Sequence, residues 1–232
     1  MLITKVVIGA VALLFAGTAS ALPKDEAETL SESATVLTEI RNAPDKGIPE
    51  SIWAKAECVI VIPDLKKAGF IVGGESGSGA MSCRTRDRWS PPVFMKMTKG
   101  SIGLQAGVQS ADIVLLVMNR SGLDKLLSDK TTLGADASVA AGPVGRQASA
   151  ATDAQLTAQM LAYSRAKGLF AGVSLSGGTL RPDKSSNEAA YGATVTAREI
   201  VTGTARVTTP VEAGTFLAAL HRGDVSATTG QK

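Results

Sequence analysis

The chain of 232 residues carries 24 Lys and Arg against 21 Asp and Glu, and 44% of its residues are hydrophobic. This near-balance of charge excludes a dedicated nucleic-acid binder, which carries a strong basic excess, and the apolar share excludes a disordered chain. Two Cys are too few for a four-cysteine zinc site or a disulfide-dense small domain. Gly contributes 24 residues and aromatics only 4%, which indicates many tight turns around an aliphatic core.

Residues 1–21 have the layout of a secretory signal peptide. Lys5 supplies positive charge, residues 6–16 form an apolar run, and Ala19-Ser20-Ala21 matches an A-x-A cleavage site. The apolar run is shorter than the roughly 20 residues of a membrane span, and an uncleaved anchor is the alternative. We therefore expect export to a periplasm or the cell exterior, a single domain over residues 22–225, and a flexible tail over 226–232.

Export would place Cys58 and Cys83 in an oxidising compartment. Each lies in a strand-like stretch, and the segment between them has the pattern of a hairpin. Pairing of the two strands would allow a disulfide, and two buried thiols are the alternative.

The first element expected after the leader is an amphipathic helix over residues 23–42. Ala27, Leu30, Ala34, Leu37 and Ile40 recur at helical spacing. Acidic residues occupy its first turn, where the helix dipole favours negative charge. A second, short helix is expected to begin near Pro49, because proline suits the first helical position.

The period then changes from helix to strand. Strands are expected over residues 58–62, 69–81, 93–97, 102–108, 112–118, 132–141, 156–163 and 168–180, with a short helix over 121–129. Residues 156–163 also fit a helix, but their alternation favours a strand. The first strand is expected to stop at Pro63.

Two capping boxes predict helices near the C-terminus. Thr196 and Glu199 would open one helix that Gly203 closes, and Thr209 and Glu212 would open another that Gly223 closes. The whole pattern predicts an α+β fold, with a curved antiparallel sheet or partial barrel and the helices of both termini packed on it.

Two glycine-rich segments resemble each other. The first has glycine at positions 69, 73 and 79, and the second has glycine at 168, 172 and 178, each after a strand and a basic turn. Related halves would explain the match, and so would two bulged strands that need glycine for the same steric reason.

The residues for common catalytic chemistry are missing from the sequence. His221 is the single His and falls in the last turn expected of the final helix, where an imidazolium suits the dipole. Neither a G-x-S-x-G elbow nor a phosphate-binding glycine motif is present, and no cluster has metal-ligand spacing. We therefore expect no enzyme activity, no cofactor and no metal.

Three blocks of the sequence resemble the SYLF-domain family, which includes yeast actin-bundling proteins and many exported bacterial proteins. The blocks are residues 56–74, residues 103–117, and residues 166–183 (AKGLFAGVSLSGGTLRPD) with the following Asn187, Tyr191-Gly192 and residues 197–200. The resemblance implies a non-enzymatic module that binds anionic phospholipid, with a phosphoinositide-like headgroup in eukaryotic members. An envelope protein that binds a protein partner and no lipid is the alternative.

Eukaryotic members of the SYLF family are expected to use an N-terminal amphipathic segment at the membrane. The first helix of this sequence departs from that expectation. Residues 23–42 carry five acidic side chains against Lys24 and Arg41, and an acidic helix is repelled by anionic lipid. We therefore expect this helix to pack on the body of the domain. Bacteria generally lack phosphoinositides, so the ligand expected is an anionic bacterial phospholipid or a host lipid.

Basic residues in turns and strands are the candidate lipid-binding site. They are Lys66, Lys67, Arg84, Arg86, Arg88, Lys96, Arg165, Lys167 and Arg181. The arginines at 84, 86 and 88 have the period of a strand, which would place three like charges on one face. Four or five basic residues near an anionic surface supply roughly 4–5 kcal/mol, a millimolar-range affinity.

Overall fold

A computed structural model describes residues 21–43, 47–69, 72–86, 88–102, 109–145, 157–166, 169–173 and 175–229. The leader expected over residues 1–21 lies almost wholly outside these ranges, as does the strand expected over 102–108. No helix in the described ranges combines the length and the apolar character that crossing a membrane requires.

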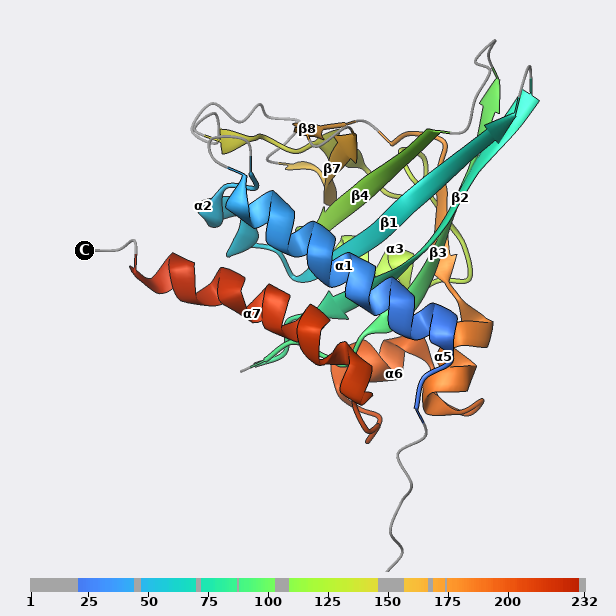
Figure 1. Cartoon of the computed structure of the whole chain (residues 1–232), viewed down its shortest axis with the longest axis vertical. Coiled ribbons are helices and arrows are strands. Elements are labelled where there is room, and N and C mark those ends of the chain that lie inside the picture. The colour runs from blue at the N-terminus through green and yellow to red at the C-terminus, as the bar shows by residue number, and fades with distance from the viewer. Residues whose placement is uncertain are drawn as a thin grey trace, which may run out of the picture.

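The core element is a curved, mostly antiparallel sheet (Figure 1). Its described strands are β1 (Cys58–Gly69), β2 (Val72–Cys83), β3 (Val93–Ile102), β4 (Gln109–Val117), β5 (Thr131–Thr132), β6 (Val139–Ala141), β7 (Met160–Ala166), β8 (Leu169–Gly172) and β9 (Thr179–Pro182). They follow the order β5-β9-β3-β2-β1-β4-β7-β6, with β8 also paired to β7. Only the β6–β7 pair is parallel among these strands.

Helices cover both faces of the sheet. They are α1 (Lys24–Asn42), α2 (Glu50–Trp53), α3 (Arg120–Leu126), α5 (Lys184–Tyr191), α6 (Ala197–Thr202) and α7 (Gly214–Thr229). On one face α1 and α7 lie side by side across the strands (Figure 1) and bury Leu37 and Phe216 in a shared core. On the other face Leu126 of α3 and Ile200 of α6 pack on the sheet. The α+β architecture expected from the sequence is therefore confirmed.

The helix expected over 23–42 is α1, and it packs on the domain as predicted. Its buried side is made of Leu30, Leu37 and Ile40, each fully buried. The spacing that predicted this helix is therefore also the spacing that buries it.

The first strand does not stop at Pro63 as expected. β1 continues to Gly69, because the chain forms a bulge where its register shifts between Val61 and Lys66. Proline is tolerated at a bulge, where no ladder hydrogen bond is needed from its nitrogen. Asp64 adopts a positive φ of 49° there, and its amide donates a 3.0 Å hydrogen bond to Asp112 Oδ1.

Two long strands expected from the sequence are each broken by a turn. The segment expected over 132–141 forms β5 and β6, and the segment expected over 168–180 forms β8 and β9. Gly134 and Gly177 have positive φ values of 86° and 82° in the two breaks. Glycine adopts this conformation without steric cost, so it ends pairing where other residues would extend it.

The two capping boxes have different outcomes. Thr196 and Glu199 form the expected reciprocal cap of α6, and Gly203 ends that helix at a φ of 71°. The box at Thr209 is wrong: a 3-10 turn begins after Pro210, and Glu212 instead accepts a 3.3 Å hydrogen bond from the Leu22 amide. α7 then passes through Gly223 to Thr229, into the segment expected to be a tail.

Glycine in β2 allows a close approach of two strands. A Cβ atom added at Gly79 would lie 2.1 Å from the carbonyl oxygen of Val61, beside the β1 bulge. At Gly172 an added Cβ would lie 2.1 Å from the carbonyl oxygen of Gly142. These members of the two glycine-rich segments therefore share a steric role, although their neighbours differ.

Cys58 and Cys83 form a disulfide, the pairing that the sequence left open. They are directly opposite residues of β1 and β2, and both are buried on the α3 and α6 side of the sheet. The bridge therefore joins neighbouring strands at the end where β1 begins and β2 finishes.

Candidate anion-binding surface

Two basic side chains lie directly opposite each other on neighbouring strands. Lys96 of β3 pairs in register with Arg181 of β9. Neither forms an ion pair with a carboxylate in the described part of the chain. Like charges at directly opposed positions destabilise a sheet, so this pair favours a bound anion.

A third cation lies on the same face of the sheet. Lys66 of β1 is opposite Ser76, and Ser78, two residues further along β2, is opposite Lys96. Alternate residues of a strand share a face, so Lys66, Lys96 and Arg181 point to one side. The Lys66 ammonium lies 3.2 Å from Asp64, with both side chains largely exposed, so solvent weakens this ion pair.

The opposite face of the same strands carries two more lysines. Lys67 of β1, Glu75 of β2 and Lys99 of β3 are successive cross-strand neighbours. One acid therefore lies between two bases. In Figure 1 these ends of β1, β2 and β3 extend beyond α1 and α7, so the described strand ends form a positively charged projection of the sheet.

The arginine row expected at 84, 86 and 88 is not a strand. The Thr85 amide donates to the Arg88 carbonyl oxygen, which closes a turn, and Arg84 pairs only with Trp89 in an isolated bridge. Arg86 and Arg88 are exposed in this turn. The three side chains therefore do not form one row, because the chain reverses direction between them.

Arg84 has a structural environment. Its Nε donates a 3.0 Å hydrogen bond to the Ala56 carbonyl oxygen and its Nη2 a 3.3 Å bond to the Trp53 carbonyl oxygen. Its guanidinium carbon lies 4.4 Å from the centroid of Trp89, a cation–π contact. These contacts tie the turn after β2 to α2 and the segment that follows it.

Arg165 is paired with acids and holds α1 to the sheet. Its Nε donates a 2.6 Å hydrogen bond to Asp112 of β4, and its Nη1 forms an ion pair with Glu39 of α1. Its guanidinium also lies 5.7 Å from the centroid of Phe170. Lys167, the other basic residue of this turn, lies outside the described residues.

The side of α1 that faces the β1 bulge is acidic. The pKa of Glu32 is raised by partial burial and by the negative charges of Glu28, Asp64 and Asp112, against the lowering effect of the nearby Lys66 ammonium. Burial also raises the pKa of Asp112, against the lowering effect of the hydrogen bond from the Asp64 amide. An anion is therefore disfavoured beside this side of α1.

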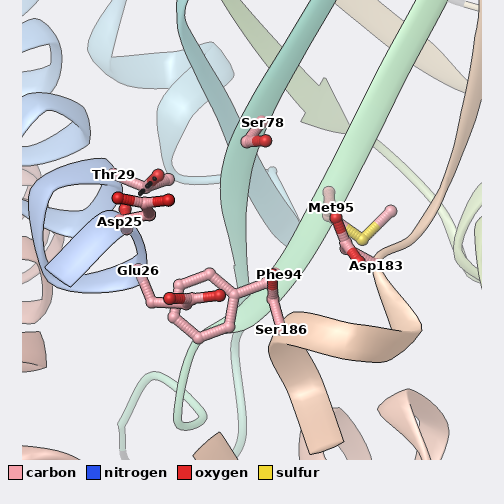
Figure 2. A pocket seen from close by; sticks show the side chains of 8 residues that line it. All are labelled: Asp25, Glu26, Thr29, Ser78, Phe94, Met95, Asp183 and Ser186. Carbon is pink, nitrogen blue, oxygen red and sulfur yellow. Dashed lines mark hydrogen bonds between the residues drawn. The ribbon is translucent and has the colours of Figure 1, made fainter. Parts of the chain in front are cut away.

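A small cavity lies between the first turn of α1, the middle of β2, the beginning of β3, and α5 (Figure 2). Its volume is about 40 Å³, and its walls include the carboxylates of Asp25, Glu26 and Asp183. This space is far below the 300–1,000 Å³ of usual ligand pockets. The cavity therefore excludes a lipid headgroup both by size and by charge.

α5 was not predicted from the sequence, and it fixes the position of β3 beside this cavity. Asn187 accepts a 2.9 Å hydrogen bond from the Phe94 amide and donates a 2.8 Å bond to the Phe94 carbonyl oxygen. Tyr191 donates a 2.5 Å bond to the Pro92 carbonyl oxygen. Both residues belong to the block that resembled the SYLF family, and that block was the available signal for their role.

Comparison with known proteins identifies close sequence relatives. The chain is 36% identical to LAS seventeen-binding protein 3 of Saccharomyces cerevisiae over 166 residues, which is 70% of this chain and 36% of the yeast protein. It is 32% identical to SH3 domain-containing YSC84-like protein 1 of Bos taurus over 194 residues, 82% of this chain and 56% of that protein. The chain thus spans between about a third and just over half of these relatives.

A family model also matches residues 98–223, more than half of the chain. The family is described as "Ysc84: Las17-binding protein actin regulator", a description of binding and regulation. The matched region runs from β3 to α7 and includes β9 and α5, which carry Arg181 and Asn187. The chain belongs to the Ysc84 family, also called the SYLF family.

Proposed function

We propose that this domain binds anionic phospholipid surfaces through basic side chains on β1, β3 and β9 of its sheet, without enzyme activity. The binding residues are Lys66, Lys96 and Arg181 on one face and Lys67 and Lys99 on the other. The observation that carries the proposal is the direct opposition of Lys96 and Arg181. A phosphate placed between these two side chains would relieve their repulsion, and arginine suits bidentate phosphate contacts.

The size of the effect limits how tightly the domain binds. Five basic residues near an anionic surface supply about 5 kcal/mol, which corresponds to a sub-millimolar affinity. Because this attraction is electrostatic, added salt should weaken it. The name of the yeast relative, LAS seventeen-binding protein 3, describes a binding protein, which supports a binding role without enzyme activity.

The test is co-sedimentation with vesicles of phosphatidylcholine alone or mixed with phosphatidylglycerol. The double substitution Lys96→Gln with Arg181→Gln should weaken binding to the anionic vesicles about thirtyfold, since each charge contributes about 1 kcal/mol. Lys125→Gln with Arg206→Gln is the matched control, because it removes the same charge at exposed positions that are not part of the proposed binding surface. Vesicles with a phosphoinositide at equal total charge test the headgroup.

Two results would reject the proposal. Equal binding of the wild-type chain to anionic and neutral vesicles would reject the proposed binding of anionic lipid. Equal losses in the two double variants would reject the assigned surface, because binding would then follow net charge alone.

A protein partner is the second candidate function. The matched family is described as an actin regulator that binds Las17. Co-sedimentation of the lipid-free domain with purified actin filaments would favour it. The same Lys125 and Arg206 variant serves as the control for charge-driven adsorption to actin, which is also acidic.

Export is part of the proposed function. The A-x-A site at residues 19–21 places the mature N-terminus at Leu22. The Cys58–Cys83 disulfide supports export, because such bonds persist in oxidising compartments. Mass spectrometry of the protein recovered from a periplasmic fraction should show Leu22 as the first residue, and a chain that begins with Met1 in the cytoplasm would contradict export.

A further inference from the structure

A second pocket lies at the other end of the sheet, beside the disulfide. It is formed by the segment between α2 and β1, the end of β2, and the helices α3 and α6, and its volume is about 330 Å³. This volume is within the range of small-molecule sites, which is about 300–1,000 Å³. Cys58 marks this end of β1, and Lys66 of the proposed lipid surface lies eight residues further along the strand, a separation of about 25 Å. The pocket is therefore separate from the proposed lipid surface.

The walls of this pocket are amphipathic. Leu123 of α3 and Val201 of α6 contribute apolar side chains that are 4% and 3% exposed. Lys55, Arg84 and Arg120 contribute three positive charges and Glu57 one negative charge. A ligand that fills the pocket therefore meets apolar surface together with a net charge of two positive units.

The cations differ in how they are held. Arg84 is fixed by its bonds to the carbonyl oxygens of Ala56 and Trp53 and by the Trp89 ring. Lys55 and Arg120 are exposed and form no ion pair with the described acids, including Glu57. The pocket thus has one oriented guanidinium and two side chains that can move onto a ligand.

We infer that this pocket binds a phosphate monoester with a short apolar body. A phosphate monoester carries about −1.5 to −2 charge at pH 7, which matches the net charge of the walls. Arg120 suits the phosphate oxygens, and the apolar body would lie on Leu123 and Val201. Arg84 adds positive charge while its Nε and Nη2 stay bonded to backbone carbonyl oxygens. The volume of about 330 Å³ is too small for the two acyl chains of a phospholipid.

Such a phosphate could belong to a soluble ester or to a membrane lipid with a phosphomonoester headgroup. Isothermal titration calorimetry with hexyl phosphate tests the soluble source, with inorganic phosphate and hexanol as comparisons. Vesicles that contain phosphatidic acid, compared with phosphatidylglycerol at equal surface charge, test the membrane source. If a pocket variant loses binding to hexyl phosphate but still binds vesicles with phosphatidic acid, the ligand is a soluble ester. If the variant loses both kinds of binding, the ligand is the lipid headgroup.

Three variants locate the binding. Arg120→Gln and Lys55→Gln should each weaken hexyl phosphate binding about tenfold, the scale of a lost charge-assisted hydrogen bond. Ala54→Trp places a large side chain into the pocket from an exposed position and should abolish the binding. Lys125→Gln removes a charge from the same helix α3 without touching the pocket and should leave the affinity unchanged.

The inference is overturned if hexyl phosphate gives no saturable heat with the wild-type protein. It is also overturned if Arg120→Gln, with an unchanged melting temperature, binds hexyl phosphate as tightly as wild type. If hexanol binds as tightly as hexyl phosphate, the pocket does not recognise the phosphate. If inorganic phosphate binds as tightly as hexyl phosphate, the pocket does not recognise the apolar body. Either result overturns the inference. The variant of Lys96 and Arg181 should bind hexyl phosphate normally, so this test and the vesicle test fail independently.

Discussion

Arg165 and Asp112 lie directly opposite each other on β7 and β4, and Arg165 Nε donates a 2.6 Å hydrogen bond to Asp112. The other oxygen of Asp112 accepts a bond from the Asp64 amide in the β1 bulge. Glu39 adds the C-terminal half of α1 to the same network through its ion pair with Arg165. One partly buried arginine therefore links a helix, two strands and a bulge.

The Arg165→Gln substitution should lower the free energy of unfolding by about 2–3 kcal/mol. It leaves Asp112 partly buried without its countercharge, and removal of one partner from a buried ion pair is the costly change. Chemical denaturation measures the loss. Arg198→Gln is the matched control, because its pair with Asp124 is about half exposed on both sides and should contribute under about 1 kcal/mol. Equal losses in both variants would contradict the linking role of Arg165.

The Glu32→Gln substitution should stabilise the protein at neutral pH. The folded state raises the pKa of Glu32 above its ordinary value of 4.5, so the folded state holds this proton more strongly than the unfolded state. The stability linked to it is present below pH 4.5 and is lost as the pH rises through the raised pKa. The higher melting temperature of the variant at pH 7 should therefore disappear as the pH falls to 4.5.

Glu199→Gln is the control for the pH series, because its effect on stability at neutral pH should have the opposite sign to that of Glu32→Gln. Its pKa is lowered by the hydrogen bonds from Thr196 in the capping box, so its charged form stabilises the folded state. The variant should be less stable than wild type at neutral pH and should match it as the pH falls through the lowered pKa. The same sign for both variants would contradict the charge assignments.

The Arg84→Ala substitution should lower the free energy of unfolding by about 2 kcal/mol. It removes two hydrogen bonds to backbone carbonyl oxygens and the cation–π contact with Trp89. Arg86→Ala and Arg88→Ala should change stability by less than about 0.5 kcal/mol, because both side chains are exposed in the turn. A thermal melt of the three single variants distinguishes the structural arginine from its neighbours.

The Gly79→Ala substitution should destabilise the protein by about 1–3 kcal/mol, the usual cost of overpacking. The added Cβ would lie 2.1 Å from the Val61 carbonyl oxygen, so β1 and β2 would have to move apart. Gly100→Ala is the matched control in β3, where an added Cβ meets no atom within 4 Å. Denaturant unfolding should show a loss for Gly79→Ala alone, and a loss at both positions would refute the close approach.

Local pattern predicted much of the fold because the same residues set both local conformation and burial. The spacing of Leu30, Leu37 and Ile40 predicted α1, and these residues form its buried side. The candidate site was less predictable. Arg84 and Arg88 had a strand period in the sequence, but a backbone hydrogen bond between Thr85 and Arg88 closes a turn there.

Contacts between distant residues account for the remaining differences. Thr209 and Glu212 have the spacing of a capping box, yet the Glu212 carboxylate binds the amide of Leu22, 190 residues away in sequence. Pro63 has the character of a strand end, yet Asp112 of β4 supports the bulge that carries the strand past it. A local sequence motif does not form its expected structure when a residue distant in the sequence provides a better hydrogen bond in the packed state.

The fold class, the family blocks, the first helix and the cap of α6 could be predicted from the amino-acid sequence, because each depends on residues close together in the chain. The glycine content predicted many tight turns, and only the packed strands show why Gly79 lies against Val61. The tertiary structure alone decided that Lys96 lies opposite Arg181 and that Arg165 pairs with Glu39. Strand order and register bring those charges together, and they follow from packing across the whole sheet.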